Sequence, residues 1–148
     1  RVAMGADPQQ TLTAFREAEA YDGPSLIIAY SHCIAHGIDM RKGLDQQYRA
    51  VNSGHWPLLR YNPVTKWRGG NPFLLDSPRP RLKLADYIYR ELRYKMLKAA
   101  DPAEAERMLE LAQRTVDQRW EQYEEMATRS AAQFESDARA NDPRKDLS

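Results

Sequence analysis

The side chains best suited to chemistry in this sequence lie close together, around Cys33. Cys33 is the one cysteine of the chain, and two of the three histidines, His32 and His36, flank it. Thiolate and imidazole groups bind zinc in tetrahedral geometry, and a thiol beside an imidazole can act as a nucleophile. The third histidine is His55. The segment around Cys33 is therefore the first candidate for a functional site.

Neither chemistry is complete in the sequence. Adjacent residues such as His32 and Cys33 seldom reach one ion, and no second cysteine is present, so a self-contained zinc site is disfavoured. A Cys33–His36 nucleophile would fit within one turn of loop, but no Gly-rich oxyanion segment accompanies it. The simplest alternative is a buried structural cysteine beside two ordinary histidines. The residues alone leave these three interpretations open.

A short apolar segment would position Cys33. Residues 25–30 read Ser-Leu-Ile-Ile-Ala-Tyr after Gly23-Pro24, which favours a strand buried on both faces, as in a parallel sheet. Cys33 would then lie at the carboxyl end of this strand, where open α/β sheets bind their ligands. We expect an α/β fold with a partial parallel sheet.

Helices alternate with short strands along the rest of the chain. Helices are expected at residues 8–21, 39–52, 84–98 and 101–127, and further strands at residues 56–61 and 73–75. Capping residues for three of these helices are Asp7, Asp39 and Asp101. In the first helix, Leu12, Phe15 and Ala18 are expected to face inward. Because three strands cannot complete a doubly wound sheet, another part of a larger assembly must cover the apolar strand.

Composition limits the class of protein. The chain has 148 residues, the length of one domain, with a mean hydropathy of -0.76. A single cysteine excludes an internal disulfide and fits a reducing compartment, so we expect a cytoplasmic protein. No segment approaches the roughly 20 apolar residues that a membrane span needs. The chain starts Arg-Val-Ala-Met, which indicates a piece of something longer.

The charge is unevenly distributed. Residues 1–40 carry a net -3 and residues 101–148 a net -5, whereas residues 41–100 carry thirteen Lys and Arg against four acids, a net +9. This basic middle could bind nucleic acid, attract an acidic protein or contact the acidic flanks. Because its basic residues are not interleaved with aromatic residues in a nucleic-acid motif, no nucleic-acid partner is expected.

Several stretches in order resemble one enzyme family. They are residues 2–6, 17–38, 56–63, 71–73, 94–97 and 119–120. Together they resemble the carboxyl-terminal part of pyruvate:ferredoxin (flavodoxin) oxidoreductase. The resemblance implies that residues 1–83 are the end of a thiamine-diphosphate-binding α/β domain. Residues 84–132 would be a helical extension, and residues 133–148 a polar tail.

The resemblance also implies a role for Cys33. In that family the matching cysteine is the fourth thiolate of the [4Fe-4S] cluster nearest the thiamine, and the other three come from elsewhere in the chain. His32 and His36 would then point N–H groups at the cluster. The family enzyme is a homodimer that oxidises pyruvate with coenzyme A and passes electrons to ferredoxin or flavodoxin. Thiamine diphosphate and Mg²⁺ are bound mainly by parts absent from this sequence, so the piece alone should not catalyse the reaction.

A second hypothesis belongs to a different class. The chain would be a non-catalytic module that docks a partner subunit through residues 41–100 and the apolar stripe of its last helix.

Overall fold

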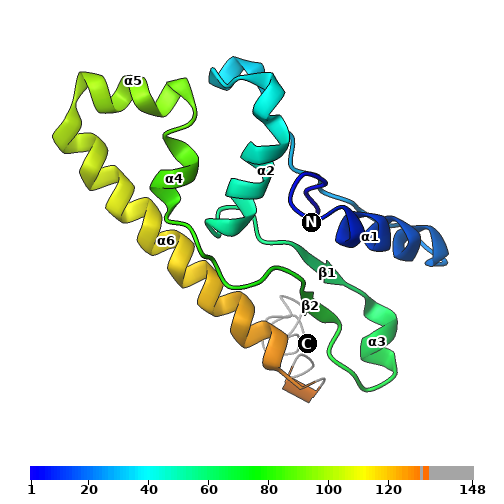
Figure 1. Ribbon diagram of the computed structural model, residues 1–148. Coiled ribbons are helices and arrows are strands. Elements are labelled where there is room, and N and C mark those ends of the chain that lie inside the picture. The colour runs from blue at the N-terminus through cyan, green and yellow to red at the C-terminus, as the bar shows by residue number, and fades with distance from the viewer. Residues whose placement is uncertain (131, 134–148) are drawn as a thin grey trace, which may run out of the picture.

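A long helix, α6 (Pro102–Thr128), runs along one side of the molecule (Figure 1). This computed structural model describes residues 1–130 and 132–133, so nearly all of the expected tail, residues 133–148, lies outside the described residues. The carboxylate of Asp101 accepts a hydrogen bond from the Glu104 N–H at 3.0 Å, and Pro102 occupies the first turn. The expected capped helix is therefore confirmed.

The remaining elements are mostly short helices. They are α1 (Pro8–Ala20), η1 (Ile34–His36), η2 (Met40–Lys42), α2 (Gly43–Asn52), α3 (Pro63–Trp67), α4 (Leu84–Ile88) and α5 (Leu92–Ala100), with strands β1 (Leu59–Tyr61) and β2 (Phe73–Leu75). No helix in the described part of the chain is long and apolar enough to cross a membrane. The fold is mixed α/β, with more helix than strand.

The sheet differs from the expected one. The two expected strands form, but β1 and β2 pair with each other in antiparallel register, with Arg60 opposite Leu74. In the described residues, parallel pairing is limited to a single bridge between Val2 and Ala29. Residues 25–30 are extended, yet Leu26 is 83% exposed. Within this chain residues 25–30 are therefore not a strand buried on both faces, because none of the described residues forms a second layer over them.

Helix α1 also turns a different face inward. Its cap is as expected, since the Asp7 carboxylate accepts from the Gln10 N–H at 2.8 Å. However, Leu12 and Phe15 are exposed, and Gln10 is the buried residue of the helix. The Gln10 side-chain amide donates to a carboxylate oxygen of Asp76 at 2.8 Å. A polar contact, not an apolar stripe, therefore sets the rotation of α1.

The helix expected at residues 84–98 is divided. It ends after α4 and begins again as α5, with Glu91 between them in an extended conformation. This break carries the side chain of Glu91 into the interior, where it is 1% exposed. The prediction of one continuous helix is therefore wrong. The reason is that Glu91 buries its carboxylate at the break.

Two small apolar clusters form the core. One joins α2, α4 and α6 through Ala50, Leu84, Tyr87, Ile88 and Val116. The other contains Ala3, Val51 and Leu58. Tyr30 and Trp56 pack against both clusters, so they link the two halves of the core. The apolar stripe of α6 is confirmed as packing, since Val116 and Trp120 are buried.

Candidate functional site

Residues 31–38, the cysteine loop, connect Tyr30 to the start of η2 and carry Cys33. The Cys33 thiol is free and partly exposed, and the next residue, Ile34, is 70% exposed. The Cys33 carbonyl accepts a hydrogen bond from the His36 N–H at 3.1 Å, which closes the single turn of η1. Cys33 is thus not the buried structural cysteine that the sequence left open as an alternative.

Tyr30 fixes the beginning of the loop. Its hydroxyl lies 2.6 Å from the hydroxyl of Tyr87, and its ring meets Trp56 edge-on with centroids 5.5 Å apart. Its backbone N–H donates to the Val2 carbonyl at 2.9 Å. Burial raises the pKa of both tyrosines, so both phenols stay neutral, and one hydroxyl donates its hydrogen bond to the other.

His32 fixes the loop against α2. The Gln47 side-chain amide donates to its Nδ1 at 3.2 Å. The imidazole also lies directly over Gly43, where an added Cβ would come within 2.0 Å of the His32 Nε2. The first residue of α2 must therefore be glycine for the ring to fit.

Gly37 fixes the other end of the loop against α5. Its φ of 71° lies in the left-handed region, and its carbonyl accepts from the Leu92 N–H at 3.3 Å. An added Cβ would come within 2.3 Å of the Leu92 Cβ. Both the backbone angle and the close contact require glycine here.

Beside Gly37, the buried carboxylate of Glu91 organises the polar groups under the loop. It accepts hydrogen bonds from Arg93 Nε at 2.6 Å and from the Gln46 amide at 3.2 Å. The His36 Nδ1 lies 3.8 Å from the same carboxylate. Arg93 and Gln46 thus compensate for burying this charge, and His36 faces it.

The sequence did not single out Glu91, although a signal was present. Glu91 follows Leu84, Tyr87 and Ile88 at helical spacing, so it is an acid on an otherwise apolar face. An acid at such a position must be paired or hydrogen-bonded inside the protein.

The four residues considered for zinc do not meet. His55 packs against Tyr87, with ring centroids 4.7 Å apart, and burial together with nearby Arg119 lowers its pKa. Among residues 1–130 and 132–133, no three His, Cys, Asp or Glu side chains are grouped so that they could hold one metal ion. Cys33 is a free and partly exposed cysteine outside any such group.

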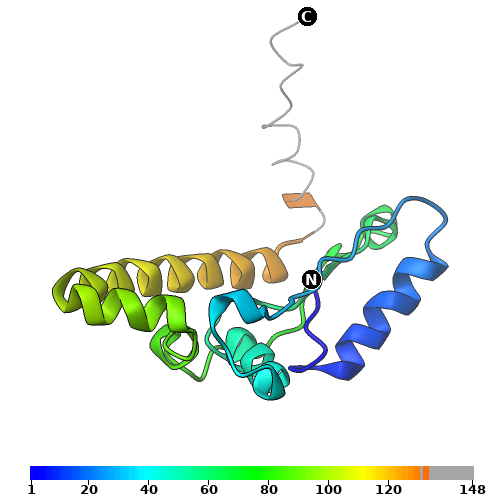
Figure 2. The same ribbon diagram turned by 90° about the horizontal axis from the view of Figure 1, so that it is seen from above.

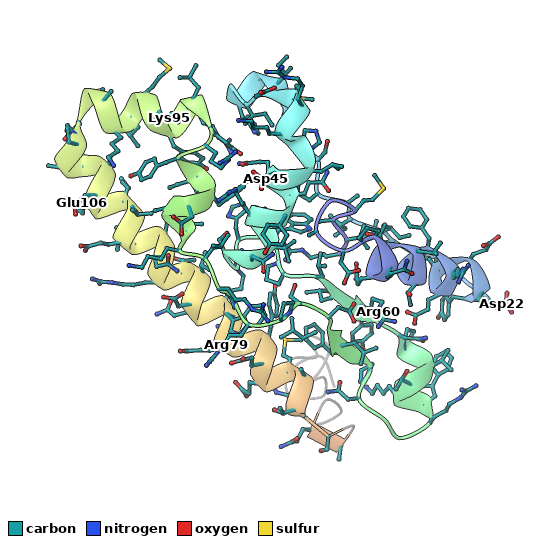
Figure 3. All side chains as sticks on the ribbon, viewed as in Figure 1. Asp22, Asp45, Arg60, Arg79, Lys95 and Glu106 are labelled. Atoms are coloured by element: carbon teal, nitrogen blue, oxygen red, sulfur yellow. The ribbon has the colours of Figure 1, made fainter. Side chains whose placement is uncertain are left out.

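The charged residues of the basic middle have mixed surroundings. Arg60 pairs with Glu17 of the acidic first part, and Arg79 pairs with Glu124 of α6 at 3.0 Å (Figure 3). These pairs support the interpretation that the middle contacts its acidic flanks. Other basic residues, Lys42, Arg90 and Lys95, line a cleft of about 410 Å³ next to Gly37.

Comparison with known proteins tests the family resemblance seen in the sequence. The chain is 52% identical over 128 residues to a pyruvate-flavodoxin oxidoreductase of Nostoc sp., an alignment that covers 86% of this chain and 11% of the relative. It is 46% identical over 126 residues to the pyruvate:ferredoxin oxidoreductase of Moorella thermoacetica, covering 85% of this chain and 11% of that protein. The chain is homologous to a segment of these oxidoreductases. The resemblance expected from the sequence is thereby confirmed.

The homology extends to a differently named enzyme. A mitochondrial pyruvate dehydrogenase [NADP(+)] of Euglena gracilis is 39% identical over 119 residues, covering 79% of this chain and 7% of that protein. No family model matches the chain. The chain spans about a tenth of the length of the pyruvate-flavodoxin oxidoreductases that it matches.

Proposed function

We propose that this chain is a working part of a pyruvate:flavodoxin or pyruvate:ferredoxin oxidoreductase. The enzyme would convert pyruvate and coenzyme A to acetyl-CoA in the cytoplasm, as a homodimer, with thiamine diphosphate and Mg²⁺ bound mainly outside this chain. The support comes from the identity of 46–52% to enzymes of those names. Residues 1–83 would complete the thiamine-diphosphate-binding domain, and residues 84–132 would extend it with helices.

Within that enzyme, Cys33 supplies one of the four thiolates of a [4Fe-4S] cluster. Such a cluster would carry single electrons between the thiamine and ferredoxin or flavodoxin. The observation that carries this proposal is the geometry of the cysteine loop. A free, partly exposed sulfur lies on a loop that is fixed by Tyr30 at its start and by Gly37 near its end.

The two flanking histidines have a positioning role in this proposal. The sequence suggested that both point N–H groups at the cluster, but each ring has a partner within the chain. His32 contacts Gln47 and Gly43, and the Nδ1 of His36 faces Glu91. We assign them to holding the loop, so that the sulfur stays where the remaining three ligands meet it.

Substitution of Cys33 in the full-length enzyme tests the ligand assignment. Cys33→Ser should lower the iron content by up to about four atoms per protomer, the content of one cluster, and remove one cluster signal from the electron paramagnetic resonance spectrum. Ile34→Ser, a change at the exposed neighbour, should leave both unchanged. Unchanged spectra and undiminished pyruvate-dependent electron transfer in Cys33→Ser would show that Cys33 is not a ligand.

A docking role is the second candidate, and one observation favours it. Apolar side chains on the outer faces of α5 and α6 are exposed, namely Leu92, Met96, Leu97, Met108 and Leu111. Such a face fits contact with another part of an assembly. A purified chain that stays monomeric and captures a defined acidic subunit, together with an unchanged iron content of Cys33→Ser in the full-length enzyme, would favour this module over the cluster-ligand proposal.

A further inference from the structure

The extended segment 24–28 and strand β1 form the two walls of a groove whose floor is α1. The segment returns above α1 after the helix ends (Figure 2). The groove has a volume of about 460 Å³, and Ala14 and Ala18 contribute small side chains to its floor. We call it the strand groove.

One end of the strand groove already holds a strand. The Val2 N–H donates to the Ile28 carbonyl at 3.0 Å, and the Val2 carbonyl accepts from the Tyr30 N–H at 2.9 Å, which is parallel pairing. On the opposite side, Arg1 and Leu59 exchange two hydrogen bonds, at 2.8 and 3.3 Å, as an antiparallel pair does. At this end, Arg1 and Val2 therefore lie between the two walls as a single strand that pairs with both.

The wall formed by β1 continues this pairing edge. The Asn62 N–H donates to Pro72, and the Leu58 carbonyl accepts from Asp76, so the even-numbered residues of this segment face β2. By the alternation of an antiparallel ladder, the N–H and C=O of Tyr61 face the groove, as those of Leu59 do beside Arg1.

The opposite wall offers matching groups. Continuing the parallel pattern from Val2, the next available groups are the Ile28 N–H and the Leu26 carbonyl. No backbone hydrogen bond between described residues uses either group. The side chains of Leu26 and Ile28 are 83% and 47% exposed. An apolar edge of this kind is normally paired or covered.

We propose that the strand groove binds an extended apolar segment of the longer polypeptide as a middle strand. That strand runs parallel to residues 24–28 and antiparallel to β1, hydrogen-bonded to Ile28, Leu26 and Tyr61. The inference rests on the proposed function, because the homologous enzymes are about eight times as long as this chain and can supply the strand.

A second copy of this chain is a poorer occupant. A strand between two walls needs both of its edges free, whereas residues 25–30 pair with Val2, and β1 is paired on one side with β2. None of the strand segments in the described part of the chain has two free edges.

Hydrogen exchange measures the pairing directly. In the full-length enzyme, the amides of Ile28 and Tyr61 should exchange at least about a hundredfold more slowly than in the 148-residue chain. Equal exchange in the two proteins would overturn the proposal. Protection that appears in the 148-residue chain and grows with its concentration would also overturn it, because a second copy would then fill the groove.

A change in the floor gives an independent test. Ala14→Glu places a charge under the middle strand, so it should lower the melting temperature of the full-length enzyme by several degrees and leave the 148-residue chain unchanged. Thr13→Glu, on the exposed side of α1, is the matched control and should change neither protein. An effect of Ala14→Glu equal in both proteins would contradict the proposal. Neither readout depends on whether Cys33 binds a cluster.

Discussion

The cysteine loop owes its shape to residues with little side-chain bulk. Gly43 leaves room for the His32 ring, and Gly37 supplies a backbone angle and a close contact that other residues do not tolerate. The conspicuous residue is Cys33, but its place is decided by two glycines and by the buried carboxylate of Glu91. At this scale, stability and the candidate function depend on the same contacts.

Gly37→Ala should destabilise the chain more than Gly69→Ala. Both glycines have positive φ, 71° and 78°, so both substitutions incur about 1–2 kcal/mol for the left-handed backbone. The Cβ at position 69 meets nothing within 4 Å, whereas at position 37 it would overlap Leu92. The overlap should add about 1–3 kcal/mol. Urea unfolding of the two variants measures the difference, and equal midpoints would show that Leu92 yields without cost.

Sequence reasoning singled out Cys33 and missed the residues that hold its loop. A lone cysteine between two histidines is visible in any reading of the sequence. The roles of Gly37 and Gly43 depend on contacts with Leu92 and His32, which come from distant elements and leave no local pattern. Glu91 could have been found, since it interrupts an apolar helical face.

Among the elements, α1 is attached to the sheet by a charged cluster. The carboxylate of Asp76 accepts from Arg60 and from Gln10, each at 2.8 Å, and Arg60 also pairs with Glu17 of α1. Figure 3 shows Arg60 on β1, beside α1. These contacts replace the apolar face that the sequence predicted for the helix.

Asp76→Asn should reduce the stability of the chain at neutral pH. Burial alone would raise the pKa of Asp76, but the hydrogen bonds from Arg60 and Gln10 outweigh it and lower that pKa. Asp76 therefore stabilises the fold above about pH 3.9, the ordinary aspartate value, and this contribution disappears as the pH falls through the lowered pKa. The difference in stability between the two proteins should be largest near pH 7 and vanish in acid.

Thermal unfolding from pH 7 to pH 2 measures this difference. Asp22→Asn, at an exposed aspartate beyond the end of α1, is the control and should parallel the original chain. A constant difference between Asp76→Asn and the original chain at all pH values would exclude the charge as its cause.

Helix ends were easier to predict than helix faces. The capping residues Asp7 and Asp101 act as the sequence indicates, because a cap is a contact within a few residues. The inward face of α1 and the burial of Glu91 depend on Asp76 and Gln46, which lie 66 and 45 residues away from their partners in the chain. The predicted parallel pairing of the strands was wrong for a similar reason, because the partner of a strand is also chosen by contacts between distant residues.

At the scale of the molecule, much apolar surface is uncovered. Among the residues that the structure describes, the most exposed large apolar ones are Leu26, Trp67 and Ile34, on three different segments. A chain with such a surface fits a part of a larger enzyme better than an independent domain. The sequence predicts the same, because the apolar strand expected at residues 25–30 needs a covering layer that the chain does not supply.

The 148-residue chain should bind a hydrophobic dye such as ANS more strongly, per mole, than the full-length enzyme does. Leu26→Lys should reduce the dye fluorescence of the chain while leaving its melting temperature within about 2 °C, because surface changes usually cost under 0.5 kcal/mol. A matched change at an already polar exposed site, Thr13→Lys, should leave the fluorescence as it was. Strong dye binding that Leu26→Lys does not alter would place the uncovered surface elsewhere.

The hydroxyl pair of Tyr30 and Tyr87 has a consequence for assembly. Tyr30 packs against both core clusters and lies three residues before Cys33. The loop that follows it is a short bridge between two fixed supports, the tyrosine pair and the contact of Gly37 with Leu92. The contacts within the chain therefore set the position of its sulfur, and in the proposed enzyme the other three cluster ligands would have to meet it there.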